Sequence, residues 1–183
     1  MLGSENAQKP NNFMFYVLLC IVLLAFVHHV TSTYSLVSVD GGSMNNTLVD
    51  GDVLFVKENA QVERGDIIVI NHPENGMVIK RVIAMAGDVI KCEDFLVYLK
   101  KSGEDEFVAL DEPYVSSSTP DFYEQTIGEN EIFVMGDNRA PSIDSKIYGP
   151  IKADYVVGVV TEWSIKNRNF VKTVFGWTFK FDR

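Results

Sequence analysis

Residues 77–85 read Met-Val-Ile-Lys-Arg-Val-Ile-Ala-Met, and only Lys80 and Arg81 interrupt this apolar run. Its β-branched residues favour a strand, and the turn residues Ala-Gly-Asp follow at 86–88. Alternation along a strand places Lys80 on a face whose other members are apolar. The stretch therefore predicts a strand buried on both faces, with one lysine inside it.

Burial would allow Lys80 to act as a general base. Desolvation disfavours the ammonium form and can lower a lysine pKa from about 10.4 to near neutrality, where an uncharged amine acts as a base. The plainer alternative is a lysine at a strand edge whose ammonium reaches solvent.

Short strands separated by Gly, Asp and Asn turns continue on both sides of this run, without a sustained helical period. The predicted strands cover 52–56, 66–71, 77–85, 89–92, 95–99, 107–110, 131–135, 155–163 and 172–181. This pattern predicts one mainly β domain, a compact multi-stranded sandwich or partly closed barrel.

Two segments of this body allow alternative interpretations. The loop 111–130 has little regular pattern and is expected either to cross a substrate groove or to be an ordinary solvated loop. The aromatic alternation Phe175, Trp177, Phe179 and Phe181 favours a strand packed on the core, and the alternative is an aromatic surface resting on a membrane.

Residues 13–30 are apolar apart from two histidines, and as a helix they would reach about 27 Å, close to the bilayer's hydrocarbon thickness. We expect a retained transmembrane helix rather than a cleaved secretion signal, because no A-x-A site follows the run. The predicted organisation is a cytoplasmic tail over 1–12, a span over 13–30 and an extracytoplasmic domain over 31–183, joined by a polar link at 31–38. Lys9 precedes the span, and the next basic residue is Lys57, which favours this orientation.

The net charge of the chain is −9, and this excess of acidic residues lies after the span, because Glu5 and Lys9 cancel before it. An acidic body argues against a nucleic-acid partner. With three histidines in the whole chain, two of them in the span, a histidine-rich metal site has little support, and we expect no metal and no cofactor.

The second chemical feature is Gly41-Gly42-Ser43-Met44, which places a serine on a glycine-rich turn. Backbone N–H groups in such a turn can stabilise an oxyanion, and a serine hydroxyl attacks a peptide bond when a neighbouring base takes its proton. Glycine-glycine-serine by itself is more often an ordinary turn.

Three ordered segments behind a membrane span resemble the boxes of the type I signal peptidases, membrane-bound serine proteases that use a Ser/Lys dyad. Residues 43–48 resemble S-M-x-P-T-L, residues 80–88 resemble K-R-V-I-G-x-P-G-D, and residues 136–146 resemble G-D-N-R-x-x-S-x-D-S-R. Gly-Asp at 51–52 and Asp-Glu-Pro-Tyr at 111–114 also resemble family segments. The short tail and single span look most like Gram-positive members.

The resemblance implies a role for each matching residue. Ser43 is the expected nucleophile and Lys80 the general base, and Ser142 is expected to hydrogen-bond and orient that lysine. The oxyanion hole is expected from the Ser43 backbone N–H with help from Gly41, and Asp144 is expected to pair with Lys146 and brace the site. Shallow substrate pockets are expected to be lined by Met44, Val78 and Ile79.

The chain departs from the family boxes at four positions. Asn46 replaces a proline, which is expected to loosen the serine turn, and Lys146 replaces an arginine, which leaves Asp144 a point charge in place of a bidentate partner. Ala84 and Ala86 replace a glycine and a proline. None of these changes removes a group with an implied catalytic role.

The resemblance implies an endopeptidase of the cell membrane that removes signal peptides from exported preproteins after small residues, at Ala-x-Ala sites. The implied partners are these preproteins, the lipid bilayer and the secretion translocon. A self-cleaving repressor would use a similar serine and lysine, but the span and the acidic body argue against it. The other alternative is a peptidase-like assembly or chaperone factor for surface or pilus proteins, and the presence of both Ser43 and Lys80 favours the enzyme.

Overall fold

The computed structural model describes residues 12–179, and residue contacts divide the chain into two units, 1–33 and 34–183. The first unit contains α1 (Phe13–Thr33), whose 21 residues include no charged side chain and none that is buried. At about 1.5 Å per residue, α1 is long enough to cross a bilayer. It contains the predicted span and continues to Thr33, while the predicted tail lies outside the described residues except for position 12.

The second unit is mainly β, as predicted. Its strands are β1 (Tyr34–Ser38), β2 (Val53–Glu58), β3 (Ile67–His72), β4 (Gly76–Met85), β5 (Val89–Glu93), β6 (Leu96–Lys100), β7 (Val108–Ala109), β8 (Phe122–Thr126), β9 (Glu131–Met135), β10 (Ile151–Lys152) and β11 (Val156–Val160). Its helices are α2 (Ser145–Tyr148), α3 (Glu162–Lys166) and α4 (Arg168–Phe175), with 3₁₀ turns η1 (Ala153–Tyr155) and η2 (Gly176–Phe179).

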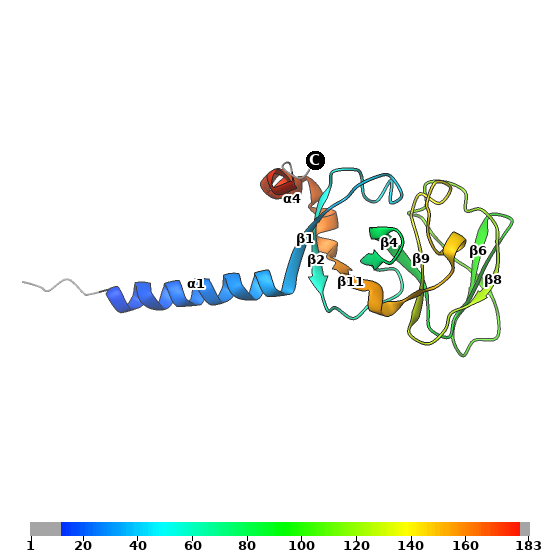
Figure 1. Cartoon of the computed structure of the whole chain (residues 1–183), viewed down its shortest axis with the longest axis horizontal. Coiled ribbons are helices and arrows are strands. Elements are labelled where there is room, and N and C mark those ends of the chain that lie inside the picture. Colours follow the sequence, from blue (N-terminus) through cyan, green and yellow to red (C-terminus); the bar gives the residue numbers. More distant parts are fainter. Residues whose placement is uncertain (1–11, 180–183) are drawn as a thin grey trace, which may run out of the picture. The chain divides into compact units, whose positions relative to one another are not determined.

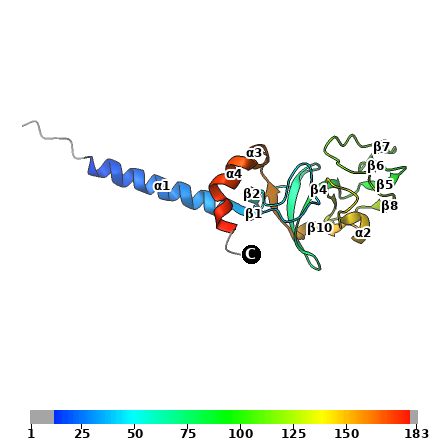
Figure 2. The ribbon, with the colours of Figure 1, turned by 90° about the horizontal axis from the view of Figure 1, so that it is seen from above.

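These strands form two open sheets. The larger has the order β1-β2-β11-β3-β4-β9-β10 and the smaller β7-β6-β5-β8. Figures 1 and 2 both show β6 and β8 at one end of this unit and β1, β2 and α4 at the other, with β4 between them. Because β4 is a central strand of the larger sheet, groups at its middle are enclosed by neighbours on both sides.

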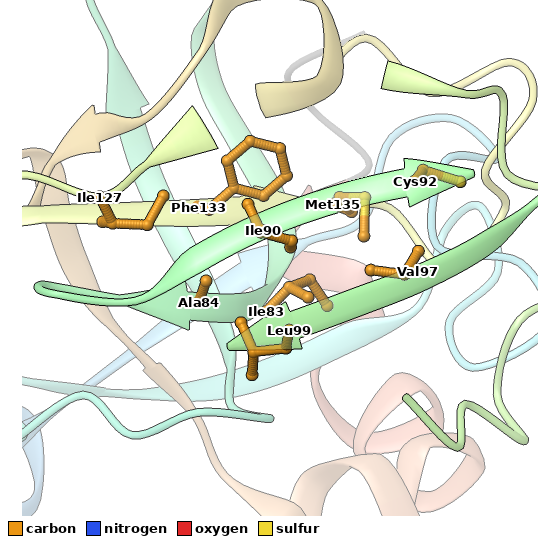
Figure 3. Packing of buried hydrophobic residues seen from close by; sticks show 9 residues of the cluster. All are labelled: Ile83, Ala84, Ile90, Cys92, Val97, Leu99, Ile127, Phe133 and Met135. Atoms are coloured by element: carbon orange, nitrogen blue, oxygen red, sulfur yellow. The ribbon is translucent and has the colours of Figure 1, made fainter. Parts of the chain in front are cut away.

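Three apolar clusters hold the sheets together, and two of them bear on the site. One lies where β4 and β9 pack on β5 and β6, and Figure 3 shows its members, Ile83, Ala84, Ile90, Cys92, Val97, Leu99, Ile127, Phe133 and Met135. Another contains Met44 and Leu48 from the loop after β1, packed with strand residues such as Leu54 and Val69. Burial of these two loop side chains ties the loop to the sheet, since each contributes on the order of 2 kcal/mol of apolar burial.

Several predicted element types were wrong. The predicted polar link 31–38 is the end of α1 followed by β1, which pairs along its whole length with β2. The loop 111–130 contains β8, which pairs with β5. The predicted strand 155–163 ends at Val160, because Thr161 caps α3 by accepting a hydrogen bond from the Ser164 N–H.

The predicted C-terminal strand is also wrong, because residues 168–175 form α4 and 176–179 form η2. Helical spacing buries Val171 and turns Phe175 toward β2, where its ring lies 5.4 Å from that of Phe55. The alternating aromatic residues that suggested a strand therefore lie partly in α4 and partly in η2. The last of them, Phe181, lies outside the described residues.

Candidate active site

Ser43 lies in the loop that connects β1 to β2. Gly41 has φ +86°, a conformation that L side chains rarely adopt, and it turns the chain toward the serine. Met44 and Leu48 are 1% and 0% exposed, and the Leu48 N–H donates to the Met44 carbonyl at 2.9 Å. The serine is therefore presented by a turn whose next residues are anchored in the core.

Hydrogen bonds hold this turn where the family has a proline. The Asn45 N–H donates to the Gly42 carbonyl at 3.2 Å, and the Ser116 hydroxyl donates to the Asn45 carbonyl at 2.7 Å. Asn46 itself takes no part in these bonds. The turn is thus fixed from its neighbours and from the 111–130 loop, in place of the φ restriction that a proline would impose.

Lys80 lies at the middle of β4, opposite Ile68 of β3, and is 4% exposed. Its Nζ donates to Ser43 Oγ at 2.8 Å and to the Ile79 carbonyl at 3.1 Å. Desolvation is the largest influence on its pKa and lowers it, and Asp144 raises it by a smaller amount. The edge-lysine alternative is wrong, since Lys80 is enclosed and contacts the serine hydroxyl directly.

The segment after β9 closes over the serine turn. Gly136 packs so tightly that a Cβ there would lie 2.4 Å from both the Ser43 carbonyl oxygen and Ser142 Oγ. Asn138 donates its backbone N–H to the Ser43 carbonyl at 3.0 Å and its side-chain amide to the Gly42 carbonyl at 3.1 Å. A glycine at 136 is therefore required for this close approach, and Asn138 fixes the backbone of the turn.

A buried carboxylate links the three boxes. Asp137 is 0% exposed and receives two hydrogen bonds from Arg81, at 2.9 Å and 2.6 Å, and a third from the Thr47 hydroxyl. Arg81 also donates to the Gly65 carbonyl at 2.8 Å and lies 4.0 Å from the centre of the Tyr114 ring. Because Arg81 follows Lys80 in β4, this network sets the lysine strand against the serine loop.

Asp-Glu-Pro-Tyr at 111–114 is held by a second buried arginine. Arg139 is 0% exposed and donates to both carboxylate oxygens of Glu112, at 2.9 Å and 2.6 Å, and to the Gly136 carbonyl at 3.0 Å. The Tyr114 hydroxyl donates to Glu112 at 2.8 Å. The loop that reaches Asn45 is thereby fixed to the segment that covers the serine.

The structure brings Ser142 to the site but gives its hydroxyl no partner. Ser142 is 2% exposed, and its Oγ makes no hydrogen bond among residues 12–179. The expected hydrogen bond to Lys80 is therefore absent from this arrangement. A buried hydroxyl without a partner is uncommon, and it leaves Ser142 free to pair with a group that changes during the reaction.

The two expected oxyanion donors differ. The Gly41 N–H donates to Asp50 Oδ1 at 3.1 Å, so it is already engaged. The Ser43 N–H has no acceptor among the described residues. Of the two, Ser43 supplies the N–H that is available to a developing oxyanion.

Asp144 and Lys146 form the expected pair behind the site. The Lys146 Nζ lies 2.6 Å and 2.7 Å from the two Asp144 oxygens, and its side chain is 5% exposed. The Gly136 N–H donates to Asp144 Oδ2 at 2.9 Å. A single ammonium thus contacts both oxygens, so neither is left unpaired although the planar contact of an arginine is missing.

Two cavities meet at Ser43 and Lys80. One, of about 140 Å³, is lined by all three predicted pocket residues, Met44, Val78 and Ile79. The other, of about 390 Å³, shares Val78 and extends toward Ile143. The smaller cavity suits a small apolar side chain next to the serine hydroxyl.

Sequence reasoning assigned no role to several residues that build the site. Asp137, Asn138 and Arg81 lie in the quoted boxes, which is the signal that could have found them. Asp40 and Asp50 stand beside the serine turn with no such signal. Within residues 12–179, no group of three His, Cys, Asp or Glu side chains is placed to hold a metal ion.

Comparison with known proteins gives one consistent result. Residues 12–164 match the family model described as signal peptidase, peptidase S26. The chain is 34% identical over 137 residues to signal peptidase I V of Bacillus subtilis, covering 68% of this chain and 82% of that protein. It is 32% identical over 163 residues to signal peptidase I of Bacillus licheniformis, covering 80% and 84%. A solved signal peptidase I from Enterococcus faecalis V583 aligns with a TM-score of 0.47 and 32% identity, covering 56% of this chain and 98% of that one.

Proposed function

Since this chain belongs to the peptidase S26 family of signal peptidases, it is a serine peptidase that removes signal peptides from exported preproteins, and we propose that Ser43 and Lys80 perform the cleavage. The observation that carries this assignment is the 2.8 Å contact between Lys80 Nζ and Ser43 Oγ. A buried lysine with a lowered pKa supplies the neutral amine that a serine nucleophile requires.

The reaction begins when neutral Lys80 accepts the proton of the Ser43 hydroxyl as Oγ attacks the scissile carbonyl carbon. The carbonyl oxygen becomes an oxyanion, which accepts a hydrogen bond from the Ser43 backbone N–H. One such donor typically lowers the activation barrier by about 3 kcal/mol. The Lys80 ammonium then gives its proton to the leaving amine as the C–N bond breaks. Water releases the acyl group in a second step, with Lys80 again as the base.

Two other groups support Lys80 in this scheme. Ser142 accepts a hydrogen bond from the Lys80 ammonium once it forms, which gives its buried hydroxyl a partner. Asp144 accepts a hydrogen bond from the Gly136 N–H and pairs with Lys146, and these contacts hold the segment after β9 against the serine turn. The reaction uses side chains and backbone groups of this protein together with water, and it requires no metal or organic cofactor.

Substrate choice follows from the small cavity of about 140 Å³. Met44, Val78 and Ile79 line it with apolar surface, which suits the apolar methyl group of an alanine. This supports cleavage after small residues, at sites of the Ala-x-Ala type. The preproteins meet the enzyme at the bilayer, beside the secretion translocon.

The chain is membrane-anchored through α1. We infer a single span with the amino terminus in the cytoplasm and the peptidase unit outside. Lys9 before the span supports this orientation, since basic residues favour the cytoplasmic side. Protease added to intact cells should digest the peptidase unit, and full protection of that unit would contradict the orientation.

The assignment is tested by cleavage of a preprotein with an Ala-x-Ala site, using the full chain in detergent or lipid. Wild type should cut after the second alanine, and Ser43→Ala should not. Ser35→Ala is the matched control, because it removes a half-buried β1 hydroxyl that makes no hydrogen bond with the part of the chain that the structure describes. Equal cleavage by wild type and Ser43→Ala would refute the nucleophile, and no cleavage by wild type would favour the non-catalytic assembly role.

A further inference from the structure

The larger of the two cavities at the dyad has a volume of about 390 Å³, more than twice that of the cavity assigned to the residue before the cut. It shares Asp40, Gly41, Ser43, Val78 and Lys80 with the smaller cavity. The scissile carbonyl carbon must lie at Ser43 Oγ, and the leaving nitrogen must lie where Lys80 can protonate it. With the residue before the cut in the smaller cavity, the residue after the cut therefore enters the larger one.

The wall of the larger cavity is apolar where a side chain would rest. Val78 is half-buried, and Pro141 and Ile143 are exposed, the latter by 61%. These three residues come from β4 and from the segment after β9, so they lie on two separate parts of the chain. Exposed aliphatic surface around a cavity of this size favours a long carbon chain over a short polar one.

The rim of the same cavity carries an unpartnered negative charge. Asp40 is exposed, and its carboxylate has no hydrogen bond or ion pair among residues 12–179. The other ionisable group of the lining is Lys80, whose Nζ is already engaged with Ser43 and the Ile79 carbonyl. Asp40 is thus the acidic group of this lining, and no cation of the described chain neutralises it.

The two amides of the lining add acceptor capacity. The Asn138 amide is engaged at both ends, since its nitrogen donates to the Gly42 carbonyl and its oxygen accepts from the Ser117 hydroxyl at 2.9 Å. The Asn75 amide nitrogen lies 3.1 Å from His72 Nδ1, and its carbonyl oxygen receives no hydrogen bond within the described chain. The Asp40 carboxylate and the Asn75 carbonyl oxygen thus give this lining two side-chain acceptors that have no donor within the described chain.

We propose that this cavity is a subsite for a lysine or arginine at the first position of the mature protein. The aliphatic stem of the basic side chain lies on Val78, Pro141 and Ile143, and its charged end reaches Asp40 at the rim. This inference rests on the proposed function and adds a selectivity on the side of the leaving amine. An acidic residue at that position meets Asp40 and is disfavoured.

The test is a set of preproteins with one Ala-x-Ala site and Lys, Met or Glu at the first mature position. Exposed charge pairs are worth about 0.2–1 kcal/mol each, so attraction and repulsion together predict a Lys-to-Glu ratio in kcat/KM of about two- to thirtyfold. Salt at 1 M, where the Debye length is about 3 Å, should remove most of this preference.

Two variants assign the preference to its residue. Asp40→Asn should bring the Lys-to-Glu ratio close to one, and Asp40→Lys should invert it. Asp105→Asn is the matched control, because it removes an exposed carboxylate from the loop between β6 and β7, and it should leave the ratio at the wild-type value. Thermal denaturation of each variant verifies that it is folded.

A ratio near one in wild type, or a ratio that Asp40→Asn and Asp40→Lys leave unchanged, would overturn the subsite. A second set of preproteins keeps Met at the first mature position and carries Lys or Glu at the middle position of Ala-x-Ala. If the Lys-to-Glu preference appears in this second set and not in the first, the subsite assignment is overturned. These outcomes leave the proposed function intact, because they require cleavage. Failure of wild type to cut any of the preproteins would instead count against the proposed function itself.

Discussion

The surroundings of Lys80 and Lys146 differ in one decisive respect. Both side chains are almost completely enclosed, and desolvation lowers the pKa of both. Lys146 lies within 2.7 Å of both oxygens of Asp144, whereas among residues 12–179 Lys80 contacts a hydroxyl and a carbonyl and no carboxylate. A buried lysine with a carboxylate partner is suited to bracing, and a buried lysine without one is suited to accepting a proton.

The largest expected effect separates the two lysines by activity. Lys80→Met should lower kcat/KM by about 10²- to 10⁴-fold, the range of a lost general base. The control is Lys57→Met, which removes an exposed lysine from β2 and should leave cleavage unchanged. Preprotein cleavage by the full chain measures the activity of both variants. A Lys80→Met protein as active as wild type would show that Lys80 is not the general base.

The second effect concerns the brace. Asp144→Ala leaves the Lys146 ammonium buried without its carboxylate, and breaking such a pair costs about 3–5 kcal/mol of unfolding free energy. Chemical denaturation of the full chain in detergent measures this loss. Asp105→Ala, on an exposed loop, should stay within about 0.5 kcal/mol of wild type. A similarly small change in Asp144→Ala would show that the pair does not support the fold.

Two neighbouring serines sharpen the contrast between catalysis and support. Ser142→Ala should reduce kcat by about ten- to a hundredfold, the worth of one hydrogen bond to a charged Lys80 ammonium, without loss of stability, because its hydroxyl has no partner among residues 12–179 of the free enzyme. Ser145 accepts the buried Val134 N–H at 3.1 Å, so Ser145→Ala should cost about 1–3 kcal/mol of stability with little change in kcat. Equal activities of wild type and Ser142→Ala would remove Ser142 from the mechanism.

The smallest effect is expected from Lys146→Arg, which introduces the arginine of the family box. Both Asp144 oxygens are already paired, so the change should alter stability by less than about 1.5 kcal/mol and activity by only a few-fold. Denaturation and cleavage of the same preparation measure both. A gain in activity of tenfold or more would show that the lysine at 146 limits this enzyme.

The sequence was sufficient for the parts of the fold that depend on pattern. Alternation and β-branched residues predicted β2 to β6 and β9, and three boxes predicted a serine near a strand lysine. Asp137 and Arg81 stood in those boxes, but the pairing of their charges depends on a contact between strands that spacing does not encode.

Other parts depend on tertiary contacts. The segment 34–38 is a strand because β2 pairs with it, and its mixed composition gave no such signal. The C-terminal aromatics form a helix because Val171 and Phe175 pack against the sheet, and this overrides their alternation. The engagement of the Gly41 N–H by Asp50 likewise joins residues that no motif connects.

The most direct test of an uncharged Lys80 is the pH dependence of kcat/KM for wild type on an Ala-x-Ala preprotein. Below its pKa, Lys80 is protonated and cannot accept the serine proton, so cleavage must fall as the pH falls through that value. Because burial lowers the pKa of Lys80 from 10.5, the acidic limb should lie clearly below pH 10.5, and it should be absent from any residual activity of Lys80→Met. A limb at the ordinary lysine value, or one that persists in Lys80→Met, would contradict the assignment of Lys80 as the base.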